Sequence, residues 1–160
     1  MCLTLTNRAT PYNEGKTRFK LLRKVGDHFV SFYVQEQKWV VGEWNEGREV
    51  YRNMSVEGGS PNRHDPSEYN YDHGFHVWPV FSDALAECYS RPGIPEVYLA
   101  VVEVDEFMAS GTSGWATHNA YADDVLKVET WKKARLLHAE LVPDNLDDEF
   151  WNKERKPLCA

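Results

Sequence analysis

The pattern of apolar and polar residues in the first third of the chain predicts three short β-strands. Segments 19–25 and 37–42 combine apolar and polar residues, and segment 29–34 is rich in residues enriched in strands. Gly26 and Asp27 form a turn pair between the first two segments, and a short polar link precedes the third. Because neighbouring strands with tight connections pair antiparallel, we expect a β-meander in this region.

After a long polar stretch, the pattern predicts a short strand, a helix and a buried strand. The strand covers 74–79 and ends at a proline, and Ser82 is expected to cap a helix over 83–90. The run 97–102 is apolar without alternation, which is typical of a strand covered on both faces. This run is therefore expected to lie centrally in the sheet.

The pattern in the last third is ambiguous. We expect a glycine-rich loop over 110–114 and a further strand over 125–128. Segment 129–141 fits both a helical stripe and, near its end, a strand alternation, and the good helix formers over 132–137 favour the helix. Residues 143–160 are rich in charge and are expected to form a tail.

These elements together predict one α+β domain over residues 1–160. Its sheet is expected to be antiparallel or mixed, with one or two short helices packed on it. Residues 45–72 form a long loop rich in Gly, Asn, Ser, Pro and charge. Loops of this length inside a compact domain often carry a binding function, so we expect a site beside it, although a surface excursion without any role is the alternative.

The composition narrows the function classes. A chain of 160 residues with a formal net charge of −7 fits one domain and argues against binding to nucleic-acid backbones, which need dense Lys and Arg. No run of about 18 uncharged apolar residues occurs, so we expect no membrane span. The three cysteines are an odd number without a paired spacing, and the start of the chain does not resemble a secretion signal. We therefore expect free thiols and a cytoplasmic location.

Aromatic residues and histidines gather along the meander, the long loop and the strand after it. Aromatic faces with a few polar groups are how a pocket stacks a planar ligand. The alternative is that these residues build the core of a small domain. The candidates for ligand binding are Trp39, Trp44, Tyr71, Phe75, His76, Trp78 and Ser82.

Three of the histidines lie in or just after the long loop. His64, His73 and His76 are ordinary ligand types for zinc or iron. The odd separation of His73 and His76, however, would place them on opposite faces of a straight strand. They are therefore weak candidates, and we expect no metal and no cofactor.

Cys2 is unusually placed for chemistry. Removal of Met1 would leave Cys2 at the amino terminus, with a thiol nucleophile and an amine base on one residue. With His76 as a general base or orienting group, this arrangement would suit acyl or glycosyl transfer. The alternative is that Cys2 is a small apolar residue at the start of a strand.

Several short motifs resemble a loosely defined family of small uncharacterised proteins of bacteria and their phages. The matching motifs are Met1-Cys2-Leu3, Arg18-Phe19-Lys20-Leu21-Leu22, Phe29-Val30-Ser31-Phe32-Tyr33, Val41-Gly42, Gly74-Phe75-His76-Val77, Ala84-Leu85 and Ala120-Tyr121-Ala122-Asp123. This resemblance implies a phage or mobile-element accessory protein, with interference in host defence as a possible role, and implies no particular activity.

The second half is also similar to the later half of ADP-ribosyltransferase and RNA 2′-phosphotransferase folds. His76 and Ser82 match residue types that hold an NAD-like ligand there, but no Ser-Thr-Ser or Glu-x-Glu motif is present.

Two hypotheses result from these observations. The first and preferred one is a small phage-type accessory protein that binds a small planar or phosphorylated ligand, or a host protein, through a His/aromatic cleft beside residues 45–72. The second is a Cys2-nucleophile hydrolase or transferase, for which an ADP-ribosyltransferase-like sheet is one candidate scaffold. Neither nucleic acid nor a membrane is expected as a partner, and the sequence does not set the oligomeric state.

Overall fold

The computed structural model describes residues 3–8, 10–31, 37–47, 74–89, 96–113 and 126–143. Eight strands and one helix occur among them. They are β1 (Leu3–Arg8), β2 (Thr17–Val25), β3 (His28–Ser31), β4 (Lys38–Trp39), β5 (Trp44–Glu46), β6 (Phe75–Val77), α1 (Phe81–Tyr89), β7 (Tyr98–Ser113) and β8 (Leu126–Leu141).

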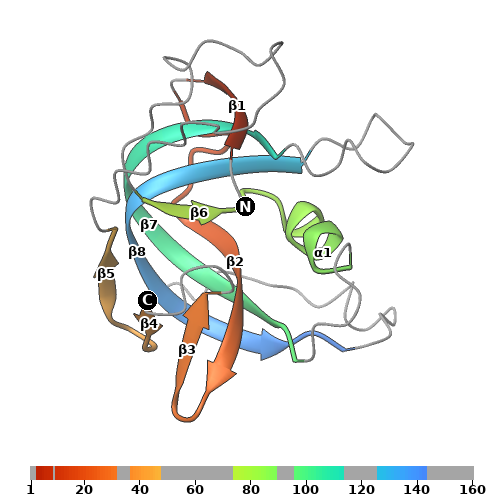
Figure 1. Cartoon of the computed structure of the whole chain (residues 1–160). Coiled ribbons are helices and arrows are strands. Elements are labelled where there is room, and N and C mark those ends of the chain that lie inside the picture. The colour runs from red at the N-terminus through yellow and green to blue at the C-terminus, as the bar shows by residue number, and fades with distance from the viewer. Residues whose placement is uncertain are drawn as a thin grey trace, which may run out of the picture.

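One antiparallel sheet contains all the strands (Figure 1). Its order is β4-β3-β2-β7-β8-β5, with β1 added to β7 and β6 added to β8. The two longest strands, β7 and β8, have 16 residues each and pair from Tyr98↔Leu141 to Ser113↔Leu126. The described part of the domain is therefore mainly β with one short helix. The expected α+β class overstated its helix content.

The edges of this sheet meet, so that it forms a nearly closed barrel. Strands β4 and β5 end the strand order on opposite sides, yet only residues 40–43 separate them along the chain. The amide N–H of Gly42 in this link donates to the carbonyl of Leu136 in β8 at 2.8 Å. Farther along, Phe19 of β2 and Trp78 exchange two backbone hydrogen bonds of 2.9 and 2.8 Å, which connects the end of β6 to β2.

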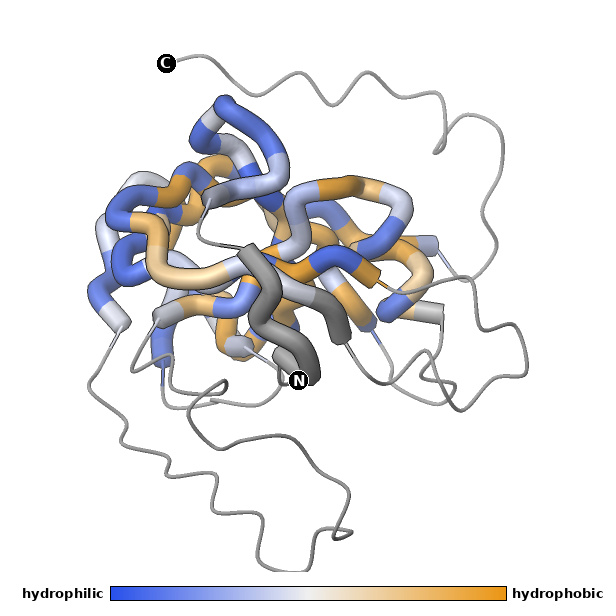
Figure 2. The backbone as a smooth tube through the Cα atoms, turned by 90° about the horizontal axis from the view of Figure 1, so that it is seen from above, coloured by the Kyte–Doolittle hydropathy of each residue, from blue (hydrophilic) through white to orange (hydrophobic). Residues whose placement is uncertain are grey.

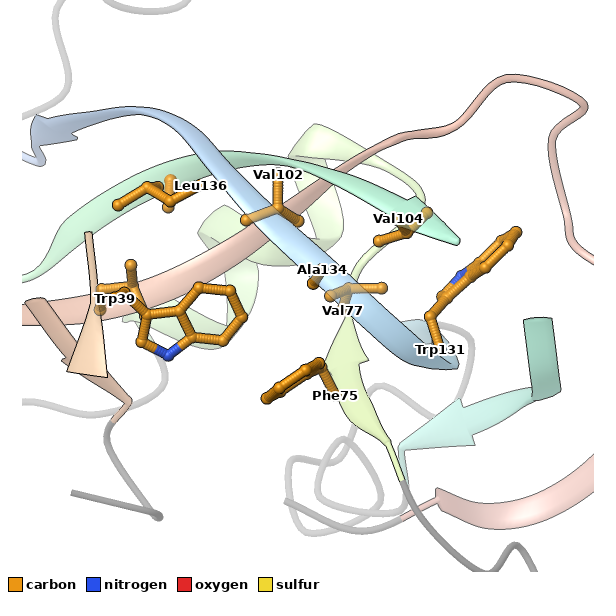
Figure 3. Close-up of a cluster of buried hydrophobic side chains, with 10 residues drawn as sticks. Trp39, Phe75, Val77, Val102, Val104, Trp131, Ala134 and Leu136 are labelled. Atoms are coloured by element: carbon orange, nitrogen blue, oxygen red, sulfur yellow. The ribbon is translucent and has the colours of Figure 1, made fainter. Parts of the chain in front are cut away.

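Two groups of buried side chains lie on opposite faces of β2. The strand cluster, drawn in Figure 3, comes from five strands and consists of Leu22, Trp39, Phe75, Val77, Ala100, Val102, Val104, Trp131, Ala134 and Leu136. The helix cluster includes residues of α1 and consists of Leu21, Trp78, Ala84, Leu85, Val97, Leu99, Ala109, Val128 and Val142. Burial of these apolar side chains is the main favourable contribution to folding, and hydrophobic and hydrophilic stretches accordingly alternate along the tube in Figure 2.

Several sequence predictions are confirmed. The first meander strand, the strand after residue 74 and the helix lie where they were expected, within two residues at their ends. Leu99, Ala100, Val101 and Val102 are all buried, as the absence of alternation indicated. Cys88 is partly buried and packs against the helix cluster.

Three sequence predictions are wrong. Segment 129–141 is strand, because a full-length pairing with β7 outweighs small differences in helix propensity. Residues 110–113 are the end of β7 rather than a loop. The helix begins at Phe81, so Ser82 lies inside it and does not cap it.

No described helix is long and apolar enough to cross a membrane.

Candidate functional site

The most unusual side chains near the strand cluster are two cations on β2. Arg18 and Lys20 lie two residues apart and therefore on the same face of the strand. Arg18 is 1% exposed and Lys20 is 8% exposed. Charged side chains are rarely buried to this extent unless they are paired, so their partners decide what each one does.

Arg18 is paired with the carboxylate of Glu129, which is fully buried on β8. The Arg18 Nε atom donates to Glu129 Oε2 at 2.5 Å, and the indole N–H of Trp131 donates to the same oxygen at 2.8 Å. The backbone N–H of Tyr12 donates to Glu129 Oε1 at 2.7 Å. Both carboxylate oxygens are thus occupied, as the burial of an ion pair requires.

The remaining guanidinium donors of Arg18 bind the segment that leads into β2. They reach the carbonyl oxygens of Asn13 at 2.9 Å, Gly15 at 2.6 Å and Thr17 at 2.8 Å. A guanidinium has five donors in a fixed planar arrangement, which suits such multiple bonding. Arg18 and its partner Glu129 therefore hold residues 12–17 against the barrel. The hydrogen bonds of Arg18 have a structural role.

Lys20 has no comparable partner. Its Nζ atom donates one hydrogen bond, to the carbonyl oxygen of His76 at 3.0 Å. It also lies 5.6 Å from the ring centre of Trp39, a cation–π contact. No carboxylate among the described residues forms an ion pair with it, and burial lowers the pKa of Lys20 to about 8.

The aromatic rings beside Lys20 are held in place. Trp39 is fully buried, and its indole N–H donates to Ser31 Oγ at 3.0 Å. Phe75 meets Trp39 edge to face, with ring centres 4.8 Å apart. Figure 3 shows these two rings side by side at one end of the strand cluster. A buried ammonium therefore lies against the ring of Trp39, which Phe75 contacts from another side.

His76 presents its carbonyl to Lys20, while its side chain lies on the other face of β6 from Phe75 and Val77. Burial, with a further contribution from the positive charge of Lys20, lowers the pKa of His76 to about 3. The imidazole is thus neutral over the ordinary pH range. Such a weak base is poorly matched to general-base catalysis near neutral pH.

The structure brings only part of the predicted ligand-binding set together. Trp39 and Phe75 lie in the strand cluster, whereas Trp78 lies in the helix cluster. Trp44 is 45% exposed on β5 and stacks on Arg135 with the guanidinium 4.9 Å from the ring centre. Ser82 is exposed on α1.

The other predicted site residues lie outside the described part of the chain. These are Cys2, His64, Tyr71 and His73. Within the described ranges, no group of three or more His, Cys, Asp or Glu side chains could hold a metal ion. For Cys88, burial raises the pKa of the thiol, which disfavours the reactive thiolate.

The sequence interpretation missed Arg18, Lys20 and Glu129. A signal for Lys20 was present, since it lies between Phe19 and Leu21 in the predicted strand 19–25, and Arg18 directly precedes that strand. The pairing of Arg18 with Glu129 joins residues 111 positions apart, and nothing local in the sequence indicates it.

No protein-family model, no curated protein and no solved structure matches this chain. The functional conclusion accordingly depends on the arrangement of the described residues alone.

Proposed function

We propose that this protein is a binding protein that holds a small planar anion at Lys20. The anchor is the Lys20 ammonium, and the rings of Trp39 and Phe75 supply the adjoining aromatic surface. This proposal keeps the planar or phosphorylated ligand expected from the sequence. It places the site at the strand cluster. This cluster contains Trp39 and Phe75, two of the residues that were expected to line a cleft.

The observation that carries the proposal is the incomplete pairing of Lys20. An ammonium group has three donors, and the His76 carbonyl accepts from only one of them. A buried charge without a counter-ion lowers stability, which is why such groups are rare away from functional sites. An anionic ligand would supply the missing charge and accept the remaining donors.

Arg18 supports the proposal by contrast. The same strand face contains a second buried cation, and there the fold provides a carboxylate, Glu129. The fold can thus neutralise a buried cation, yet no carboxylate among the described residues pairs with Lys20. A bound anion would supply the counter-charge that the described residues do not.

The aromatic pair favours a planar ligand over a compact one. Trp39 and Phe75 are fixed by an edge-to-face contact and by the hydrogen bond to Ser31. Rigid aromatic faces add stacking contacts without a large loss of side-chain entropy. Inorganic phosphate would satisfy the charge of Lys20 but would use none of this surface.

The test is calorimetric titration with AMP, benzoate, inorganic phosphate and adenosine. AMP or benzoate should bind the natural chain saturably, phosphate more weakly, and uncharged adenosine not measurably. The Lys20→Met variant should lose the binding of both planar anions. Lys24→Met removes an exposed lysine from the same strand and should bind as the natural chain does.

Binding of AMP and benzoate should also weaken as the pH rises through about 8, because the Lys20 ammonium then loses its proton. Equal binding by Lys20→Met and the natural chain would show that Lys20 is not the anchor. Absence of any anion binding at millimolar concentration would reject the proposed function itself.

A further inference from the structure

A second set of buried polar groups lies on the face of β6 and β8 that belongs to the helix cluster. The indole N–H of Trp78 and the hydroxyl of Thr130 are buried, and neither has a hydrogen-bond partner within the described ranges. Trp78 is 4% exposed and Thr130 is fully buried. Buried donors without partners lower stability, so each one in a folded protein requires an explanation.

Trp78 differs from the other two buried tryptophans among the described residues, Trp39 and Trp131. The indole N–H of Trp39 donates to Ser31 Oγ, and that of Trp131 donates to Glu129 Oε2. The fold thus supplies an acceptor at both of these positions. Trp78 instead belongs to the apolar helix cluster, together with Leu85 of α1 and Val128 of β8, and its indole N–H has no acceptor among the described residues.

The register of β6 and β8 places the two unpartnered groups on one surface. Thr130 lies directly opposite His76 in the antiparallel pair. Trp78 is two residues beyond His76 and hence on the same face of the chain. The imidazole of His76 is neutral, because burial lowers its pKa to about 3. The three polar side chains on this surface are therefore uncharged at neutral pH.

We propose that Trp78 and Thr130 form a binding site for the carbonyl group of a small uncharged ligand. A carbonyl oxygen has two lone pairs, which match one indole donor and one hydroxyl donor. The apolar surroundings disfavour a charged ligand, because no counter-charge repays its desolvation. This site is separate from the Lys20 site, since Lys20 lies on the other face of the sheet with the strand cluster.

The experiment follows the indole N–H signals of the six tryptophans by NMR while N-methylacetamide is added as the probe. The Trp78→Phe variant identifies the signal of Trp78. We expect this signal to shift saturably, while the signals of Trp39 and Trp131 stay in place. The Thr130→Val variant should bind about tenfold more weakly, because a methyl group replaces one donor.

Stability without the probe supplies a second measurement. Because Thr130→Val removes a hydroxyl that lacks a partner, the variant should melt at the same temperature as the natural chain or higher. A clear fall in its melting temperature would mean that the hydroxyl is already satisfied, for instance by a bound water, and would overturn the proposal. A shift that does not saturate, or unchanged affinity in Thr130→Val, would overturn it as well.

The Lys20→Met variant separates this proposal from the proposed function. It should lose the planar anions and keep the response of Trp78 to N-methylacetamide. If Thr130→Val is too unstable to study, Thr130→Ser keeps the hydroxyl and Trp78→Phe removes the indole donor. Equal heats of N-methylacetamide binding in those two variants would then contradict the site.

Discussion

Three cations follow one another at every second position where the chain enters and runs along β2, and each has a different environment. Lys16 is exposed and pairs with the exposed carboxylate of Asp105. Arg18 is buried and fully paired with Glu129. Lys20 is buried and has only a carbonyl oxygen and an aromatic ring. Because the strand and its face are the same, the differences come from what the opposite elements supply.

The comparison distinguishes a cation with a structural role, Arg18, from a cation that is a candidate for ligand binding, Lys20. At Arg18, the partners come from β8 and from residues 12–17, and all of them serve to hold the barrel together. Lys20 is also buried, but no described carboxylate compensates its charge. A charged group that costs stability in the folded protein is a candidate for a ligand site.

The largest effect is expected when the Arg18 pair is broken. Arg18→Met leaves the Glu129 carboxylate buried and without its cation. Breaking a buried ion pair in this way costs about 3–5 kcal/mol of unfolding free energy. Urea unfolding followed by tryptophan fluorescence should show this loss.

A double variant sharpens this result. Adding Glu129→Gln to Arg18→Met removes the buried charge and should recover part of the lost stability. If the double variant lost the sum of the two single losses, Arg18 and Glu129 would act independently and the pair would have no coupling.

The next effect concerns the pH dependence of stability. The pKa of Lys20 is about 8 in the folded protein and about 10.5 for an ordinary lysine. Between these values the unfolded chain binds more protons than the folded one, so the unfolding free energy rises with pH. The rise is about 3 kcal/mol for a shift of this size. Urea midpoints between pH 7 and 10.5 should show it relative to Lys20→Met, which lacks the group.

A smaller effect is expected from Lys20→Met itself at pH 7. This variant removes a buried charge but also leaves the His76 carbonyl without its donor. The gain from the charge exceeds the lost hydrogen bond of about 1 kcal/mol, so thermal unfolding should occur at a higher temperature. A lower melting temperature would indicate that the fold compensates Lys20 after all.

The smallest effect is expected at Lys16. Its pair with Asp105 lies in solvent, where screening and side-chain entropy cancel most of the attraction. Lys16→Met should leave the urea midpoint unchanged within error. A loss comparable to that of Arg18→Met would remove the distinction between exposed and buried cations on this strand.

Much of the fold could be predicted from local patterns. The strand around 19–25, the strand at 75–77 and the buried run 97–102 each have a signal in consecutive residues. Segment 129–141 could not be assigned, because its residues fit either pattern and the choice is made by pairing with β7. Closure of the barrel depends on contacts such as Phe19 with Trp78, which local sequence does not contain.

The candidate site was predictable only in its aromatic part. Trp39 and Phe75 were expected to serve a ligand. The structure places the two rings in contact with each other, and Trp39 lies beside Lys20. Trp44 and Ser82 were expected there too, but they are exposed elsewhere. The role of Lys20 could not be found from sequence, because burial and the absence of a carboxylate are properties of the assembled sheet.

The most direct measurement is an NMR titration of the lysine side chains, with the Lys20 signal assigned by comparison with Lys20→Met. We expect Lys20 to titrate near pH 8 in the ligand-free protein, and at a higher pH when AMP is bound, because the phosphate stabilises the ammonium. A Lys20 signal that titrates near the ordinary lysine value of 10.5 in the ligand-free protein would contradict the account.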